Sequence, residues 1–81
     1  MRKEVKKEIK GSALHIEIDK LGNALCVSIC EVRSVSELSD EIVVARLKRG
    51  SVRVVGSELV VSVYENRVVE IVGAVRGIEL I

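Results

Sequence analysis

Large aromatic side chains are almost absent from this 81-residue sequence. It has no Phe and no Trp, and Tyr64 is its only Tyr. Proteins that stack bases, sugars or other flat ligands usually do so with such rings. Their absence argues against a small-molecule substrate and makes nucleic acid the less favoured partner.

Groups that bind metals or carry out catalysis are also scarce. His15 is the only His, and its place in an alternating stretch predicts an outward-facing surface residue. Together with Cys26 and Cys30 it provides too few ligands for a zinc site. On one strand these two thiols would lie about 13 Å apart, too far for a disulfide. We therefore predict free cysteines, no metal, no cofactor and no enzymatic activity.

Long apolar runs are missing as well, and no segment approaches the ~20 apolar residues that span a bilayer. The basic start is not followed by an apolar signal segment, which favours a cytoplasmic protein. Residues 1–10 contain five basic and two acidic residues, whereas the whole chain carries a net charge of only +1. We expect residues 1–12 to be a charged segment: a frayed tail, a short helix, or a contact for an acidic surface or for lipid headgroups.

The residues that are abundant are β-branched. Sixteen Val and eight Ile favour strands. Strict alternation places Leu14, Ile16 and Ile18 on one face, and Gly22-Asn23 then predicts a two-residue hairpin turn. After that turn, Leu25, Val27 and Ile29 should return along the inward face.

Turn signals recur through the rest of the chain. We predict turns at Arg49-Gly50 and Glu65-Asn66, a bend or bulge at Gly56, and a connection that buries Val35 and Leu38. The pattern predicts an all-β domain over residues 13–81, an antiparallel β-meander rolled into a small barrel or sandwich. A short β-solenoid is the alternative, because Val54-Val55-Gly56 is echoed by Ile71-Val72-Gly73.

Several predicted strands are apolar on both faces, and so short a chain has little left to cover the second face. We therefore predict a homo-oligomer or docking to a partner, with Val43 and Val60 as partner-binding residues. A closed barrel with an ordinary apolar surface is the alternative. Four cations lie around one hairpin, Arg46, Lys48, Arg49 and Arg53. They are predicted to be solvated hairpin charges or a basic patch for a protein partner, and contact with nucleic-acid phosphates is the alternative.

Three segments in order resemble the YabP/YqfC family of sporulation proteins. They are VSELSDEI at residues 35–42, GSVRVVGSEL at residues 50–59 and VEIVGAVRGIEL at residues 69–80. The ending Gly77-Ile78-Glu79 is more similar to the YqfC branch.

This resemblance implies a non-catalytic protein of bacterial endospore formation that acts in the mother cell, at the forespore membrane surface. It also implies a membrane-associated sporulation partner of the YqfD or YabQ type. We therefore expect a structural or interaction protein of spore envelope assembly. The alternative is a small nucleic-acid-binding β-barrel that uses the basic hairpin.

Overall fold

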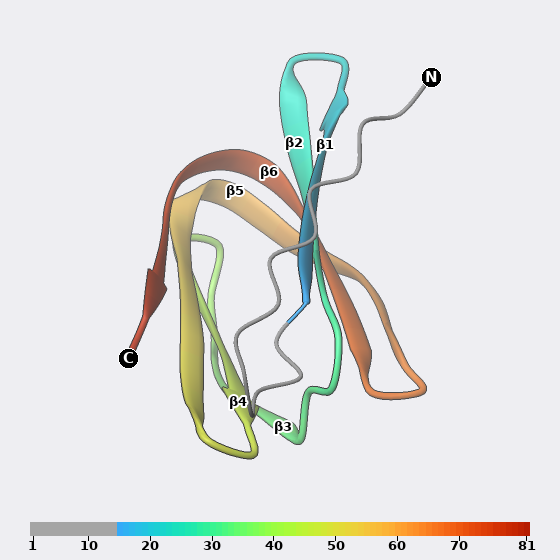
Figure 1. Cartoon of the computed structure of the whole chain (residues 1–81). Helices are drawn as coiled ribbons and strands as arrows, with labels where there is room; N and C mark the ends of the chain where they lie inside the picture. Colours follow the sequence, from blue (N-terminus) through green and yellow to red (C-terminus); the bar gives the residue numbers. More distant parts are fainter. Residues whose placement is uncertain (1–14) are drawn as a thin grey trace.

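A computed structural model describes residues 15–81, which form six strands and no helix (Figure 1). The strand order in the sheet is β1-β2-β6-β5-β4-β3, and all neighbours are antiparallel. The all-β meander is therefore confirmed, and the solenoid alternative was wrong. The expectations for residues 1–12 and for Leu14 lie outside the described residues. The strands are β1 (Ile16–Leu21), β2 (Ala24–Ile29), β3 (Ser34–Leu38), β4 (Ile42–Leu47), β5 (Gly50–Glu65) and β6 (Val68–Leu80).

The two longest strands, β5 and β6, bend together and fold the sheet into a small sandwich (Figure 1). The bend carries register shifts at Gly56 and again after Ser57. The first part of β5 pairs with β4 and with the end of β6, whereas its last part has only β6 as a neighbour within residues 15–81. One half of the sheet thus contains β1, β2, the start of β6 and the end of β5, and the other contains β3, β4, the start of β5 and the end of β6.

Glycine permits this bend because the two strands approach closely there. A Cβ on Gly73 would lie 2.7 Å from the carbonyl oxygen of Glu58 and 2.9 Å from the Cα of Leu59. No L-residue with a side chain fits in that space without a backbone shift. The bend predicted at Gly56 is confirmed.

The core lies between the two halves and consists almost entirely of aliphatic side chains. β2 contributes Val27 and Ile29, as the alternation predicted, and both are fully buried. Burying each such side chain stabilises the fold by about 1.5–3 kcal/mol relative to leaving it in water. The whole cluster is Val27, Ile29, Val32, Val43, Ala45, Val52, Val54, Leu59, Val69 and Ile71.

The predicted connection after β2 was partly wrong. Residues 34–38 form an edge strand, and Val35 packs against the core as expected. Leu38 is instead 64% exposed, and Val32 is the buried residue of this connection at 2% exposure. The Val32 amide donates a hydrogen bond to the Arg67 carbonyl, which holds the connection across the end of the sandwich.

The turns differ from expectation by one residue at two of three positions. Gly22-Asn23 is confirmed, and Gly22 has the positive φ of +65° that a type II′ turn requires. The β4–β5 turn lies at Lys48-Arg49, and Gly50 follows it with a φ of +104°. The β5–β6 turn lies at Asn66-Arg67 rather than at Glu65-Asn66.

Candidate interaction surfaces

The four cations predicted around one hairpin fall into two groups. Arg46, Lys48 and Arg49 are exposed at the β4–β5 turn. Arg53 instead forms an ion pair with Glu79 on β6, with an Nη2–Oε1 distance of 2.6 Å and an Nε–Oε1 hydrogen bond of 2.8 Å. Its charge is therefore already matched within the sheet, and the free positive charge lies at the turn.

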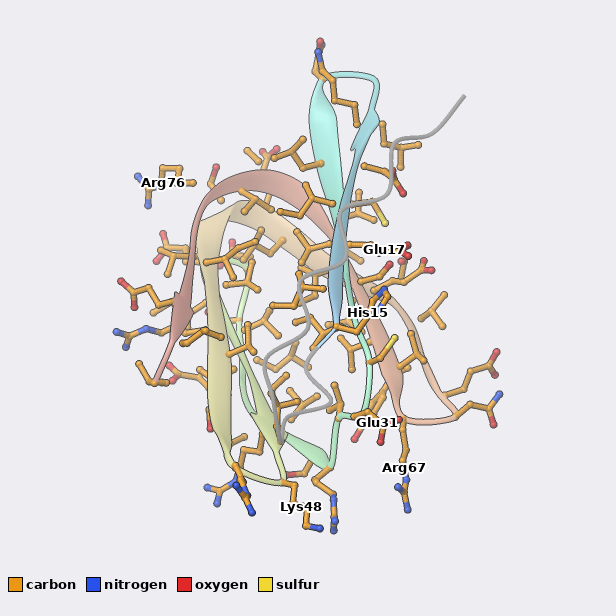
Figure 2. All side chains as sticks on the ribbon, in the orientation of Figure 1. His15, Glu17, Glu31, Lys48, Arg67 and Arg76 are labelled. Atoms are coloured by element: carbon orange, nitrogen blue, oxygen red, sulfur yellow. The ribbon has the colours of Figure 1, made fainter. Side chains whose placement is uncertain are left out.

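Two further cations, Arg33 and Arg67, lie at the same end of the molecule, and no local pattern in the sequence predicts that they do. The Arg33 amide donates a 2.7 Å hydrogen bond to the Arg46 carbonyl, and the Val32 amide donates a 2.9 Å bond to the Arg67 carbonyl. These two bonds place the β2–β3 connection between the other two turns. Figure 2 shows Lys48 and Arg67 at this end and Arg76 far from it. We name this surface the basic end: Arg33, Arg46, Lys48, Arg49 and Arg67.

All five side chains of the basic end are exposed, and within residues 15–81 none of them forms an ion pair. Glu31 and Glu65, two exposed acids, lie beside it in the chain. Five cations against two carboxylates leave a positive surface that attracts anionic groups.

Arg67 occupies a backbone conformation that suits glycine better than arginine. Asn66 and Arg67 have φ values of +52° and +63°, as in a type I′ turn, where Asn-Gly is the preferred pair. A residue with a Cβ costs about 1–2 kcal/mol in this conformation. A cation held at such a position is a candidate for function rather than for stability.

Val43 and Val60, predicted as partner-binding residues, have opposite environments. Val43 is fully buried in the core, so it is not available to a partner and its assignment was wrong. The strand segment Ile42-Val43-Val44 is apolar on both faces, so the sequence does not show which face points inward. In the structure, Val43 lies on the inward face. Val60 is 60% exposed, as a contact residue requires.

Val60 begins a strand edge that has no neighbour among residues 15–81. The register of β4 with β5 ends at the Ile42–Val55 pair, so residues 60–64 of β5 pair only with β6. We name residues Val60–Tyr64 the β5 edge. It is uncharged, and both its first and its last residue are more than half exposed.

Four apolar side chains are exposed even though their register places them on the inner face. Ile18, Leu38, Tyr64 and Leu80 pair with the fully buried Val27, Val43, Val69 and Val52, yet each is more than 50% exposed. All four lie on unpaired edges of the two half-sheets, beyond the area that the opposite half covers.

The remaining polar groups form a mixed outer face on β1, β2 and β6. His15 Nε2 lies 3.2 Å from Glu17 Oε2, and both side chains are partly exposed. Burial, and secondarily the charge of Glu70, raise the pKa of the Cys26 thiol. Burial, followed by the charges of Glu17 and Glu31, raises that of Cys30. Both cysteines are free.

Within residues 15–81, no three His, Cys, Asp or Glu side chains lie close enough together to hold a metal ion. In the same part of the chain, no helix has the length and apolar character needed to cross a membrane. No family model, no curated protein and no solved structure matches the chain.

Proposed function

We propose that this protein is a non-catalytic interaction protein that binds an anionic segment of a protein partner through its basic end. The observation that carries the proposal is the convergence of five cations from three connections and the end of β4, none of which forms an ion pair within residues 15–81. The conformational cost of Arg67 supports it, because glycine at that position would give a more stable turn.

The setting that we propose is bacterial endospore formation, in the cytoplasm of the mother cell. Its support is the order of the three segments that resemble the YabP/YqfC family. The corresponding partner is a membrane-associated sporulation protein of the YqfD or YabQ type, and the process is assembly of the spore envelope.

The test is direct binding of the full chain to a purified YqfD-type or YabQ-type protein in detergent. Reversing two charges with Lys48→Glu and Arg49→Glu should weaken binding at least tenfold and reduce its salt dependence, since opposed charges steer and hold such complexes. Arg76→Glu makes a similar change away from the basic end and should bind like the unaltered chain (Figure 2). No binding to either type of protein, or equal losses in both variants, would contradict the proposal.

Nucleic acid is the second candidate, because phosphates are attracted to the same five cations. Duplex DNA should then form a complex at low salt, and that complex should weaken steeply as salt is raised. A gel-shift experiment compares the unaltered chain with the Lys48→Glu and Arg49→Glu variant, which should lose this complex. A complex with DNA but none with the protein partner would favour this second function.

A further inference from the structure

We propose that the outer face of β2 and β6 binds the basic residues 1–10 of the same chain. The inference uses neither the basic end nor the sporulation partner, and it goes beyond the proposed function. It rests on the apolar side chains of this face, on its single sign of charge, and on the charge, apolar spacing and length of the chain before His15.

Aliphatic side chains lie together on the outer side of this part of the sheet. Cys26 pairs with Val72, and Val72 pairs with Val60, so the three side chains form one row across β2, β6 and β5. The next row places Val63 beside Glu70, and all of these side chains are at least partly exposed. Within residues 15–81 no further element covers them, because the six strands form one sheet whose two halves meet at the core. An apolar sheet face without a second layer favours contact with another segment.

The charges on this face are of one sign. Glu17 and Asp19 lie on it from β1 and Glu70 lies on it from β6, on either side of β2. Figure 2 shows Glu17 beside His15, which it contacts. Burial raises the pKa of the Cys26 thiol, and the charges of Glu70 and Asp19 raise it further. Within residues 15–81, no Lys or Arg occupies an outward strand position in this half of the sheet, so the face attracts a cationic segment. We name this surface the β2–β6 face: Val60, Val63 and Val72 with Glu17, Asp19 and Glu70.

The outer face of the other half of the sheet carries charges of both signs. Arg53 forms its ion pair with Glu79 there, and Val44, which pairs with Arg53 in the register, is only 8% exposed. That face is already matched in charge and partly covered by its own side chains. A basic segment is therefore attracted to the β2–β6 face instead.

Residues 1–10 have the charge and the apolar spacing that the β2–β6 face requires. They contain five basic and two acidic residues, and Met1, Val5 and Ile9 follow one another at intervals of four. Side chains four residues apart lie on the same side of a helix and also of a strand. In either conformation, an aliphatic side flanked by lysines can meet the valines and carboxylates of the face.

The chain before β1 is long enough to reach across the whole β2–β6 face. Lys10 is five residues before His15, and a fully extended chain of that length spans about 17 Å. The face is four strands wide, which is about 14 Å at the usual strand spacing. The covalent connection also gives residues 1–10 an effective concentration of about millimolar order. A contact too weak to form between separate molecules can therefore form within one chain.

The test is methyl NMR of the full 81-residue chain at low salt. Nuclear Overhauser contacts should join the methyl groups of Val5 or Ile9 to those of Val60 or Val72. They should not reach the methyl groups of Val55, which lies on the outer face of the other half of the sheet. Because salt screens exposed charges, the contacts should weaken as the salt concentration rises.

Charge reversals test whether the two surfaces are complementary. Lys6→Glu with Lys7→Glu should remove the contacts, whereas Lys6→Arg with Lys7→Arg keeps the charge and should keep the contacts. Asp19→Lys with Glu70→Lys should also remove them, and the two pairs of reversals combined should restore them. A loss of folding cannot produce that restoration, and thermal unfolding of each variant checks that it is folded.

The absence of any contact between residues 1–10 and the β2–β6 face at low salt would overturn the inference. So would contacts that occur only between isotope-labelled and unlabelled chains, because these would assign the face to a second copy. If the full chain instead bound phosphatidylserine vesicles through Lys6 and Lys7 and showed no contact with the face, the target of the segment would be lipid headgroups. Each of these results leaves the basic end unaffected, because partner binding through Lys48 and Arg49 is measured separately.

Discussion

Gly56 and Ala74 face each other so closely across the bend that a Cβ on Gly56 would overlap the Ala74 carbonyl oxygen. The overlap is with backbone, which cannot rotate away as a side chain can. We therefore expect Gly56→Ala to destabilise the domain by about 3 kcal/mol. In a domain of this size, that lowers the Tm by roughly 12 °C or more.

Gly77→Ala is the matched control for this first prediction. Gly77 lies on the same strand pair, its φ is not in the left-handed region, and nothing lies within 4 Å of its added Cβ. The unfolding free energy of the Gly77→Ala variant should differ from that of the unaltered chain by no more than about 0.5–1 kcal/mol. Thermal unfolding of both variants checks the prediction, and equal Tm values would contradict the role given to Gly56.

Arg67→Gly should make the protein more stable and a weaker binder at the same time. Glycine relieves the positive φ of +63° in the β5–β6 turn, which should raise stability by about 1 kcal/mol. Arg49→Gly removes the same charge at a turn residue without a positive φ and should give no such gain. Urea unfolding of both variants, together with partner binding, separates the two effects. A loss of stability in Arg67→Gly would show that its side chain supports the fold.

The ion pair between Arg53 and Glu79 should contribute little to stability despite its short distances. Both side chains are about half exposed, and such pairs contribute about 0–1 kcal/mol. Glu79→Gln should therefore cost less than about 1 kcal/mol. Arg53→Ala should cost more, because Val44 lies directly opposite Arg53 in the register and the arginine stem covers apolar surface. Equal unfolding free energies for the two variants would contradict this order.

The two cysteines should react slowly with iodoacetamide at neutral pH, because the thiolate is the reactive form and both thiol pKa values are raised. Glu70→Gln removes a negative charge near Cys26 and should lower the pKa of that thiol, so that Cys26 reacts faster. Cys30 is the internal control, since the charges that act on it come from Glu17 and Glu31. Mass spectrometry of the alkylated peptides measures both rates, and parallel changes in the two would refute the assignment.

The same shifts determine how stability depends on pH. A thiol whose pKa is higher in the folded state than in the unfolded chain favours folding while it stays protonated. That contribution is complete below pH 9.0, the ordinary thiol pKa, and is lost as the pH rises through the folded value. The unfolding free energy should therefore decrease above pH 9.0, and less so in a Cys26→Ala variant.

The fold was predictable wherever apolar and polar residues alternate strictly. Val27 and Ile29 were assigned to the core because Cys26, Ser28 and Cys30 between them mark the other face. At Ile42-Val43-Val44 all three residues are aliphatic, so alternation does not show which of them face the core. Val43, which is buried, was therefore wrongly assigned to a partner. The prediction that Leu38 is buried was wrong for a different reason. Its pairing with Val43 places it on the inner face, but the opposite half of the sandwich does not extend over this edge strand.

The basic end was only partly predictable. Lys48 and Arg49 are adjacent and directly precede Gly50, so the sequence alone predicts that they lie at a turn. Arg33 and Arg67 join them only through backbone hydrogen bonds from the β2–β3 connection to the other two turns. These contacts join residues far apart in the chain and depend on how the whole sandwich closes. No local pattern predicts them.

The strand that lies between β2 and β5 is the last of the six to leave the ribosome. Val27 pairs with Ile71, and Val52 pairs with Leu80, so the two groups of earlier strands have no bonded neighbour in common until β6 is made. During synthesis, the apolar faces of the β1–β2 hairpin and of the β3–β4–β5 unit therefore stay exposed to water until β6 can pair with both. We therefore expect folding to be slow, since long-range pairings must form last. Until β6 emerges, the nascent chain is the form of this protein most in need of a chaperone.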